Sequence, residues 1–145
     1  MYKRLAHIGI AVRSTDKSSD LFAKLFGMSE GHTEEVIEQK VKATFFKIGD
    51  GGIELLEPTS PDSTVAKFIE KRGEGVHHLS FEVDDIEAEI ARLKKEGFQM
   101  VDEKPRIGAD GFRIAFLHPK STNGVLIEIS QRIGDRGQES GDRKS

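Results

Sequence analysis

The chain has 145 residues, of which 36% are hydrophobic and 32% are charged, so it can form one compact domain or two small modules. Its 22 basic and 25 acidic side chains give a net charge of -3, which offers no electrostatic basis for binding nucleic acid, and no apolar run is long enough to span a membrane. Cysteine is absent, which excludes disulfides and thiolate ligands, and no signal-peptide stretch follows Met1, so a cytoplasmic protein is expected.

The first half of the chain predicts a strand, a helix and two further strands. Residues 5–12 alternate between bulky apolar and small or polar side chains, which is the period of a strand. Residues 14–16, Ser-Thr-Asp, are a helix-start signal, and Gly27 is placed to cap the end of that helix. Residues 36–48 and 52–57 are predicted as strands joined by a glycine-rich hairpin turn.

The second half repeats this order after a short helix predicted over residues 63–72. Residues 76–83 alternate like the opening strand, residues 84–85 (Asp-Asp) start a helix, and Gly97 ends it. Two more strands are predicted, over residues 112–117 and 124–130.

Such internal repetition indicates a duplicated fold unit of the α+β class. The predicted boundaries are residues 1–62 for the first module, 63–73 for a linker helix and 74–131 for the second module. Residues 132–145 are rich in glycine and charged side chains, and this composition predicts a disordered tail.

Four chemically active side chains occupy matching places in the two halves. His7 and His78 each lie in the first strand of a half, 78 − 7 = 71 positions apart, and Glu54 and Glu128 each lie in the last strand, 128 − 54 = 74 positions apart. Strand alternation places all four on the face opposite the bulky apolar residues. His77 has the opposite parity and is interpreted as structural or as support for a ligand.

Two imidazoles and two carboxylates on one face of a sheet need a partner if they are buried, and a divalent cation would satisfy all of them. This donor set suits Co, Mn, Fe, Ni or Zn better than Mg or Ca. Each residue also has a plain interpretation: a single strand histidine is usually structural, and either glutamate alone could face solvent. The repeated placement in both halves is what favours the metal site.

At these residues the chain resembles the vicinal oxygen chelate (glyoxalase, bleomycin resistance, dioxygenase) superfamily and, within it, the methylmalonyl-CoA epimerase family. The similarity runs over residues 4–131. The matching segments are Ala-His-Ile-Gly-Ile-Ala-Val (6–12), Ile-Glu-Leu-Leu-Glu-Pro (53–58), Ser-Thr-Val-Ala-Lys-Phe (63–68), Gly-Glu-Gly-Val-His-His-Leu-Ser-Phe-Glu-Val-Asp-Asp (73–85), Arg-Ile-Ala-Phe-Leu-His-Pro-Lys-Ser (113–121) and Gly-Val-Leu-Ile-Glu (124–128).

The resemblance implies two tandem βαβββ modules whose strands form a curved mixed sheet around a metal cleft, usually in a homodimer. It places the metal ligands at His7, Glu54, His78 and Glu128, around one divalent ion per chain, with Co²⁺ favoured over Mn²⁺, Ni²⁺, Zn²⁺ or Fe²⁺. The implied activity is epimerisation of an acyl-CoA thioester, methylmalonyl-CoA, by C2 proton abstraction through a metal-stabilised enolate. Glu128 is the candidate acid or base.

The chain departs from part of that family at Ala43, where some members carry a second catalytic glutamate. Lys42, Glu38 or a metal-bound water is then left to serve as the second acid or base. For the CoA end of the substrate, Lys120 and Ser121 are candidate contacts, although both also suit a solvated turn.

Three other activities use a similar fold. A glyoxalase-type isomerase (lactoylglutathione lyase) would share the four ligands and differ only in substrate contacts. An extradiol dioxygenase needs two histidines and one carboxylate, so Glu54 as a fourth ligand argues against it. A non-enzymatic ligand-sequestering protein would hold its ligand between aromatic side chains, and the chain has one tyrosine and no tryptophan.

Overall fold

The computed structural model describes residues 1–134, so residues 135–145 of the predicted tail lie outside the described part of the chain. The described residues divide into two compact units. One unit is His7–His78, and the other joins Met1–Ala6 to the residues from Leu79 onward. The strands β1 (Tyr2–Ala11) and β5 (Gly75–Val83) each contribute residues to both units.

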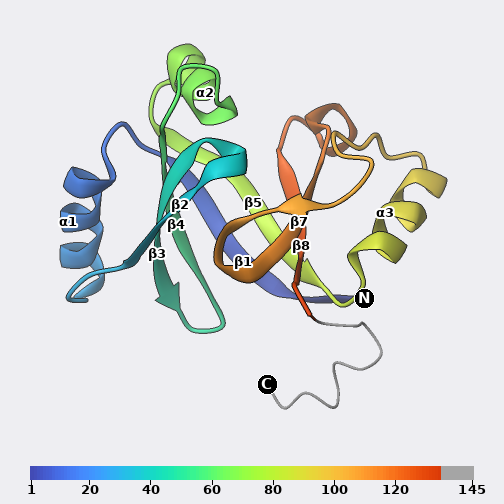
Figure 1. The fold of residues 1–145 in the computed structure, drawn as a ribbon, viewed down its shortest axis with the longest axis horizontal. Helices are drawn as coiled ribbons and strands as arrows, with labels where there is room; N and C mark the ends of the chain where they lie inside the picture. Colours follow the sequence, from blue (N-terminus) through green and yellow to red (C-terminus); the bar gives the residue numbers. More distant parts are fainter. Residues whose placement is uncertain (135–145) are drawn as a thin grey trace. The chain divides into compact units, whose positions relative to one another are not determined.

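In the His7–His78 unit, the sheet order is β2-β3-β4-β1. Strand β3 pairs antiparallel with β2 and with β4, whereas β4 pairs parallel with β1, so the sheet is mixed. The helix α1 lies beside β3 and β4 (Figure 1). The elements are α1 (Thr15–Phe26), β2 (His32–Val36), a 3₁₀ turn (Ile37–Gln39), β3 (Val41–Ile48), β4 (Gly51–Pro58) and α2 (Thr64–Arg72).

The core of this unit lies between the sheet and α1. The helix begins where Ser14 accepts a hydrogen bond from the N–H of Lys17, and it ends at Gly27, whose φ of 68° suits glycine. Its apolar stripe packs on the sheet face that carries every second residue of β3 and β4. The buried members of the cluster are Val12, Ala23, Phe46 and Leu55.

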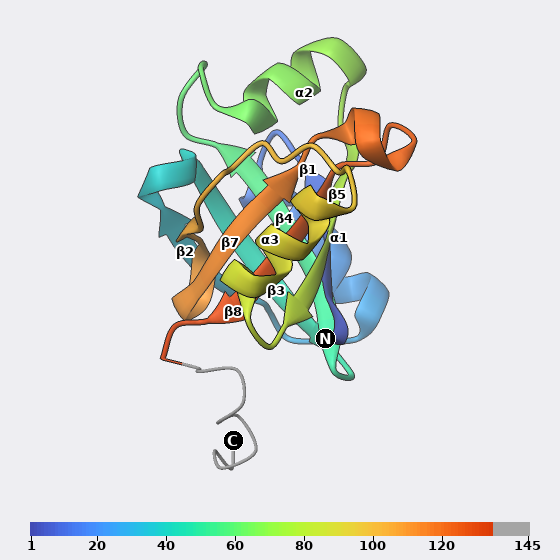
Figure 2. The same cartoon turned by 90° about the vertical axis from the view of Figure 1, so that its right-hand side faces the viewer.

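In the second unit, the sheet order is β5-β8-β7-β6. Strand β8 pairs parallel with β5 and antiparallel with β7, and Figure 2 shows α3 in front of β7 and β8, the strands that it contacts. The elements are α3 (Ile86–Lys95), β6 (Arg106–Ile107), a 3₁₀ turn (Ala109–Gly111), β7 (Phe112–Leu117), a 3₁₀ turn (Pro119–Thr122) and β8 (Ile127–Arg132). The buried core residues are Val83, Ile86, Ile90, Leu93, Met100, Ala115, Leu117 and Ile129.

The predicted α+β class is confirmed. The order β1-α1-β2-β3-β4 is repeated as β5-α3-β6-β7-β8, with α2 between them, and each repeat contains one parallel strand pair. The exact module boundaries stay a prediction. Within residues 1–134, no helix has the length and apolar character needed to cross a bilayer.

The predicted strand over residues 36–48 was wrong in its first part. Residues 37–39 form a 3₁₀ turn, and Lys40 follows it with a φ of 57°, so the chain reverses there and β2 pairs back onto β3. A reversal of this kind usually carries glycine, and a lysine in the left-handed conformation gives no local signal.

Two features of the second repeat also differ from the prediction. Strand β6 was not predicted, because two residues are too short to show a period. Strand β8 begins at Ile127 and not at residue 124, because Gly124 has a φ of 85° and the hydroxyl of Thr122 donates to the carbonyl of Val125 at 2.6 Å. The turn therefore extends three residues further than expected.

Candidate metal centre

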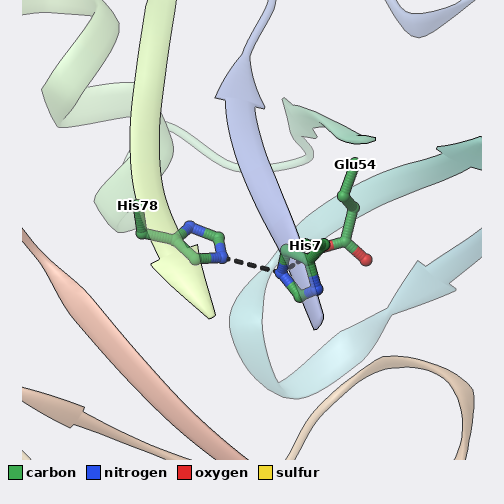
Figure 3. Close-up of side chains that lie close together, drawn as sticks. All are labelled: His7, Glu54 and His78. Carbon is green, nitrogen blue, oxygen red and sulfur yellow. Dashed lines mark hydrogen bonds and ion pairs between the residues drawn. The ribbon is translucent and has the colours of Figure 1, made fainter. Parts of the chain in front are cut away.

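Three of the four predicted ligands converge within the His7–His78 unit. His7 on β1, Glu54 on β4 and His78 on β5 each offer a donor atom, and these atoms all lie within 4.8 Å of one another. His7 Nε2 is 3.1 Å from Glu54 Oε1 and 3.0 Å from His78 Nε2. Figure 3 shows the three side chains pointing toward one another from their strands.

The register of the sheet explains why Glu54 faces His7. Gly9 of β1 is the direct partner of Glu54 on β4, and His7 precedes Gly9 by two residues, so all three share one face. Leu55, the next residue of β4, points to the other face and is fully buried against α1. The predicted direction of His7 and Glu54, away from the helix side, is confirmed.

Gly9 has a specific packing role that sequence reasoning missed. A Cβ atom at this position would lie 2.3 Å from Cε1 and 2.6 Å from Nδ1 of His78, far inside van der Waals contact. The missing side chain therefore makes the space in which the His78 ring lies. A glycine inside a regular strand two residues after a histidine was the available signal.

Aromatic and imidazole contacts hold the two histidine rings. Phe45 of β3, the register partner of Glu54, packs edge-on against His7 with ring centroids 6.5 Å apart. His77 Nδ1 is 2.9 Å from His78 Nδ1, and Phe68 of α2 packs edge-on against His77 at 5.1 Å. If His78 donates its Nδ1–H to His77, its Nε2 lone pair is directed to the site, which is the arrangement that metal-binding histidines use.

The donor set fits a divalent cation. The two Nε2 atoms face each other at 3.0 Å, and one shared proton would satisfy only that pair, whereas a cation would accept both lone pairs and the Glu54 oxygen. A metal with bonds of about 2.1 Å places neighbouring octahedral ligands about 3.0 Å apart, close to the separations here. Glu54 is 8% exposed and His78 is 4% exposed, so bulk water has little access to these donor atoms.

Glu128 lies in the other compact unit, so its role as fourth ligand stays a prediction. Its local placement repeats that of Glu54. It is buried on β8, its parallel partner on β5 is Ser80, two residues after His78, and its antiparallel partner on β7 is Phe116. Glu54 has Gly9 and Phe45 in these two places. Both halves thus present a carboxylate through the same strand register.

The two candidate contacts for CoA, Lys120 and Ser121, both lie in the 3₁₀ turn Pro119–Thr122. Lys120 is exposed in the 3₁₀ turn after β7, where its backbone N–H donates to His118 Nδ1 at 3.1 Å. The Ser121 hydroxyl accepts a hydrogen bond from the backbone N–H of Gln99 at 2.9 Å. Neither contact speaks for or against a role with CoA, and both assignments stay predictions.

The structure argues against Lys42 as a replacement for the glutamate that some family members carry at the position of Ala43. Ala43 lies on the same face as Glu54, since it is the β3 partner of Leu56, two residues further along β4. The adjacent Lys42 points to the opposite face, where its Nζ is 3.5 Å from Asp16 of α1. The suggestion that Lys42 serves as the second acid or base was therefore wrong.

Residues 6–116 match the model of the Glyoxalase/Bleomycin resistance protein/Dioxygenase superfamily. The chain is 41% identical over 136 residues to the uncharacterized protein YqjC of Bacillus subtilis, covering 94% of this chain and 97% of that one. It is 36% identical over 130 residues to the mitochondrial methylmalonyl-CoA epimerase of Dictyostelium discoideum, covering 89% of this chain and 78% of that one.

The fold is similar to that of a solved Streptomyces coelicolor methylmalonyl-CoA epimerase variant in complex with 2-nitronate-propionyl-CoA. The TM-score is 0.88 at 38% identity, covering 94% of this chain and 99% of the other. The chain therefore belongs to the glyoxalase/bleomycin resistance protein/dioxygenase superfamily, and the relatives that it matches there include methylmalonyl-CoA epimerases.

Proposed function

We propose that this chain is a metal-dependent epimerase that interconverts (2R)- and (2S)-methylmalonyl-CoA by abstracting the proton at C2. The observation that carries the proposal is the convergence of His7, Glu54 and His78 within 4.8 Å, in a chain related to epimerases of this substrate. The similarity to several such enzymes supports an isomerase. A relative that holds a propionyl-CoA analogue supports an acyl-CoA thioester as the substrate class.

The proposed ligands are His7, Glu54, His78 and Glu128, with one divalent ion per chain. Co²⁺ is favoured, and Mn²⁺, Ni²⁺, Zn²⁺ and Fe²⁺ also suit two imidazoles with two carboxylates. Bound there, the ion supplies positive charge that stabilises the negative charge developing on the thioester oxygen. The chain itself supplies rigidity: the His7 ring is packed by Phe45, and the His78 ring lies in the space left by Gly9.

Glu128 is the proposed proton-transfer group. The C2 hydrogen lies between a thioester and a carboxylate, and its removal leaves an electron pair that delocalises onto the thioester oxygen. A carboxylate in a buried position avoids competition from water and is held in place by its strand. In this proposal Glu128 takes the proton, and epimerisation requires a second group that returns one to the other face of C2.

The remaining parts of the proposal concern the CoA moiety and the assembly. Lys120 is proposed to attract a phosphate or carboxylate of the substrate, and Ser121 to donate its hydroxyl hydrogen. A homodimer is proposed from the family resemblance, and the cytoplasm is proposed from the absence of cysteine. Light scattering of the purified protein tests the dimer.

The test is incubation of Co²⁺-loaded protein with (2R)- or (2S)-methylmalonyl-CoA in heavy water. We expect deuterium incorporation at C2 together with interconversion of the epimers. Mass spectrometry measures the deuterium, and a coupled assay with a mutase that accepts only one epimer measures the interconversion. His78→Ala should lower the rate on the order of 100- to 1,000-fold. Glu96→Gln, at an exposed position that ends α3, is the matched control and should keep the full rate.

Two results would contradict the proposal. No exchange with any of the five divalent metals would remove the epimerase assignment. Unchanged exchange in His78→Ala would show that this imidazole takes no part in holding the ion. Turnover of the glutathione hemithioacetal in place of the CoA ester would instead favour the glyoxalase-type alternative.

A further inference from the structure

We propose that Glu34 is the second proton-transfer group of the epimerisation. The inference rests on the proposed function, since epimerisation needs one group on each face of C2. It comes from the strand register of the His7–His78 unit, which assigns every side chain of the four-stranded sheet to one of two faces. Glu34 lies on β2, a strand that sequence reasoning did not predict.

The register places Glu34 on the face of the candidate metal centre. Glu54 of β4 is paired with Phe45 of β3, and Phe45 is paired with His32 of β2, so these three share one face. Two residues along each strand, Leu56 is paired with Ala43, and Ala43 with Glu34. Alternation with a period of two keeps both rows on the same side of the sheet.

Ala43, which lies between Glu34 and Leu56 in the sheet, has a side chain small enough for the Glu34 side chain to extend across it. Directly opposed residues of antiparallel strands have Cβ atoms about 5 Å apart, and a glutamate side chain extends about as far. The Glu34 carboxylate lies within 4.8 Å of His32 on the same face, and because Ala43 projects only a methyl group, rotation about the Glu34 side-chain bonds would bring the carboxylate over β3, toward the strand that carries Glu54. The Glu34 side chain is partly buried at 34% exposure, and its Oε1 is 4.0 Å from His32 Nε2.

Two further carboxylates near Ala43, those of Glu57 and Glu35, lie on the side of α1. Glu57 accepts hydrogen bonds from the backbone N–H of Thr15 at 2.9 Å and from its hydroxyl at 3.1 Å. Glu35 is the register partner of Lys42, which pairs with Asp16 on the helix side. Among the strand residues of this unit, Glu34 is the one carboxylate besides Glu54 on the face that carries His7.

The proposed step balances. In one direction the Glu128 carboxylate takes the C2 proton, the C–H electron pair forms the C1–C2 double bond, and the carbonyl π pair moves to the thioester oxygen. The Glu34 carboxylic acid then gives its proton to the other face of C2, the carbonyl re-forms, and the O–H pair stays on Glu34. Exchange with water returns Glu128 to the ionised form and Glu34 to the protonated form. The reverse reaction exchanges the two roles.

The test is Glu34→Gln, assayed in heavy water with each pure epimer, with Glu35→Gln as the control on the opposite face of the same strand. We expect interconversion to fall by about 100-fold or more, because the amide cannot transfer the proton. Exchange of the C2 hydrogen should persist for one epimer, whose proton faces the remaining base, and should be lost for the other. Glu35→Gln should keep both activities.

Three outcomes would overturn the proposal. One is interconversion by Glu34→Gln within threefold of the wild type, and another is equal loss of exchange for both epimers with unchanged Co²⁺ affinity and melting temperature. The third is equal activity in Glu34→Asp and Glu34→Gln, because a shorter carboxylic acid should retain part of the transfer. If the wild type itself exchanges neither epimer, the proposed function fails, and this result is distinct from a failure confined to the Glu34 variants.

Discussion

The parallel strand pairs β1–β4 and β5–β8 have the same register in the two halves of the chain but carry different side chains beside their glutamates. Glu54 is paired in parallel with Gly9, and Glu128 is paired in parallel with Ser80. Gly9 and Ser80 each follow a candidate ligand histidine by two residues. At the first place the side chain is absent, and the ring of His78 occupies the space. At the second place a hydroxyl is buried at 0% exposure, and its oxygen makes no hydrogen bond to residues 1–134.

Under the proposed function, this difference favours different tasks for the two carboxylates. Gly9 gives up side-chain packing so that an imidazole from β5 can lie beside Glu54, which is a requirement of ligand geometry. Ser80 keeps a polar group next to Glu128 although a buried, unsatisfied hydroxyl costs about 1–3 kcal/mol. We infer that Glu54 serves to hold the ion, while the surroundings of Glu128 are suited to a polar substrate and to proton transfer.

The largest expected effect separates the two glutamates. Glu128→Gln should lower C2 exchange by about 100- to 10,000-fold, because the amide cannot accept the proton. Glu54→Gln should lower it by about tenfold or less, because the amide oxygen remains a ligand atom and only the net charge of the site changes. Exchange rates of both variants at saturating Co²⁺ measure the contrast.

Co²⁺ affinity, measured by calorimetry, serves as the control for this pair. Equal activity loss in the two variants, with equal loss of affinity, would mean that both carboxylates act only as ligands. In that case Glu128 would have no separate role in proton transfer.

A smaller effect is expected at the residues paired with the two glutamates. Gly9→Ala places a methyl group on the His78 ring, so the ring must move away from His7 and Glu54. We expect a loss in Co²⁺ affinity of about 10- to 100-fold and destabilisation of about 1–3 kcal/mol. Ser80→Ala removes an unsatisfied hydroxyl, and its unfolding free energy should be unchanged or higher by about 1 kcal/mol.

Urea unfolding of the metal-free variants and calorimetric Co²⁺ titration measure these two changes. Unaltered affinity in Gly9→Ala would show that the His78 ring is free to lie elsewhere when the ion binds. A strong destabilisation by Ser80→Ala would mean that its hydroxyl has a partner in the native fold.

Most of the fold could be predicted from local signals in the sequence. The helix-start signals at residues 14–16 and 84–85 and the helix end at Gly27 are confirmed by the structure, and the strand predicted over residues 112–117 is β7. Strand β2 was missed because its sequence, His-Thr-Glu-Glu-Val, has no apolar alternation. The turn that pairs it with β3 depends on Lys40 adopting a conformation that its side chain does not favour.

The candidate site likewise has parts that the sequence predicts and parts that it does not. The positions of His7, Glu54 and His78 could be predicted because the internal repeat and strand alternation are both visible in the sequence. Glycine at position 9 signals a close approach by another group, but the identity of that group, the His78 ring, could not be predicted because it depends on how β1 and β5 lie in the folded sheet. The face on which Glu34 lies also could not, because it follows from a register between β2 and β3 that only the folded sheet defines.

The smallest expected effect concerns the unit that contains Met1–Ala6. Its Tyr2 is the single tyrosine of the chain, and partial burial together with hydrogen bonding to the negatively charged Glu89 raises its pKa to about 12. Glu89 itself is buried beside Arg92, whose guanidinium makes hydrogen bonds of 3.0 and 2.7 Å with it and lowers its pKa. Folding therefore favours the neutral phenol.

The folded pKa of Tyr2 lies above its usual value of about 10. Its stabilising contribution is therefore complete below pH 10 and is lost as the pH rises toward 12. We expect the wild type to be more stable than Tyr2→Phe at pH 8, and the difference should shrink steadily over this interval. Urea unfolding at a series of pH values measures it, and phenolate absorbance at 295 nm follows the ionisation directly. Because the His7–His78 unit contains no tyrosine, the absorbance reports the other unit alone, and a midpoint near 10 in the folded protein would show that Tyr2 does not interact with Glu89.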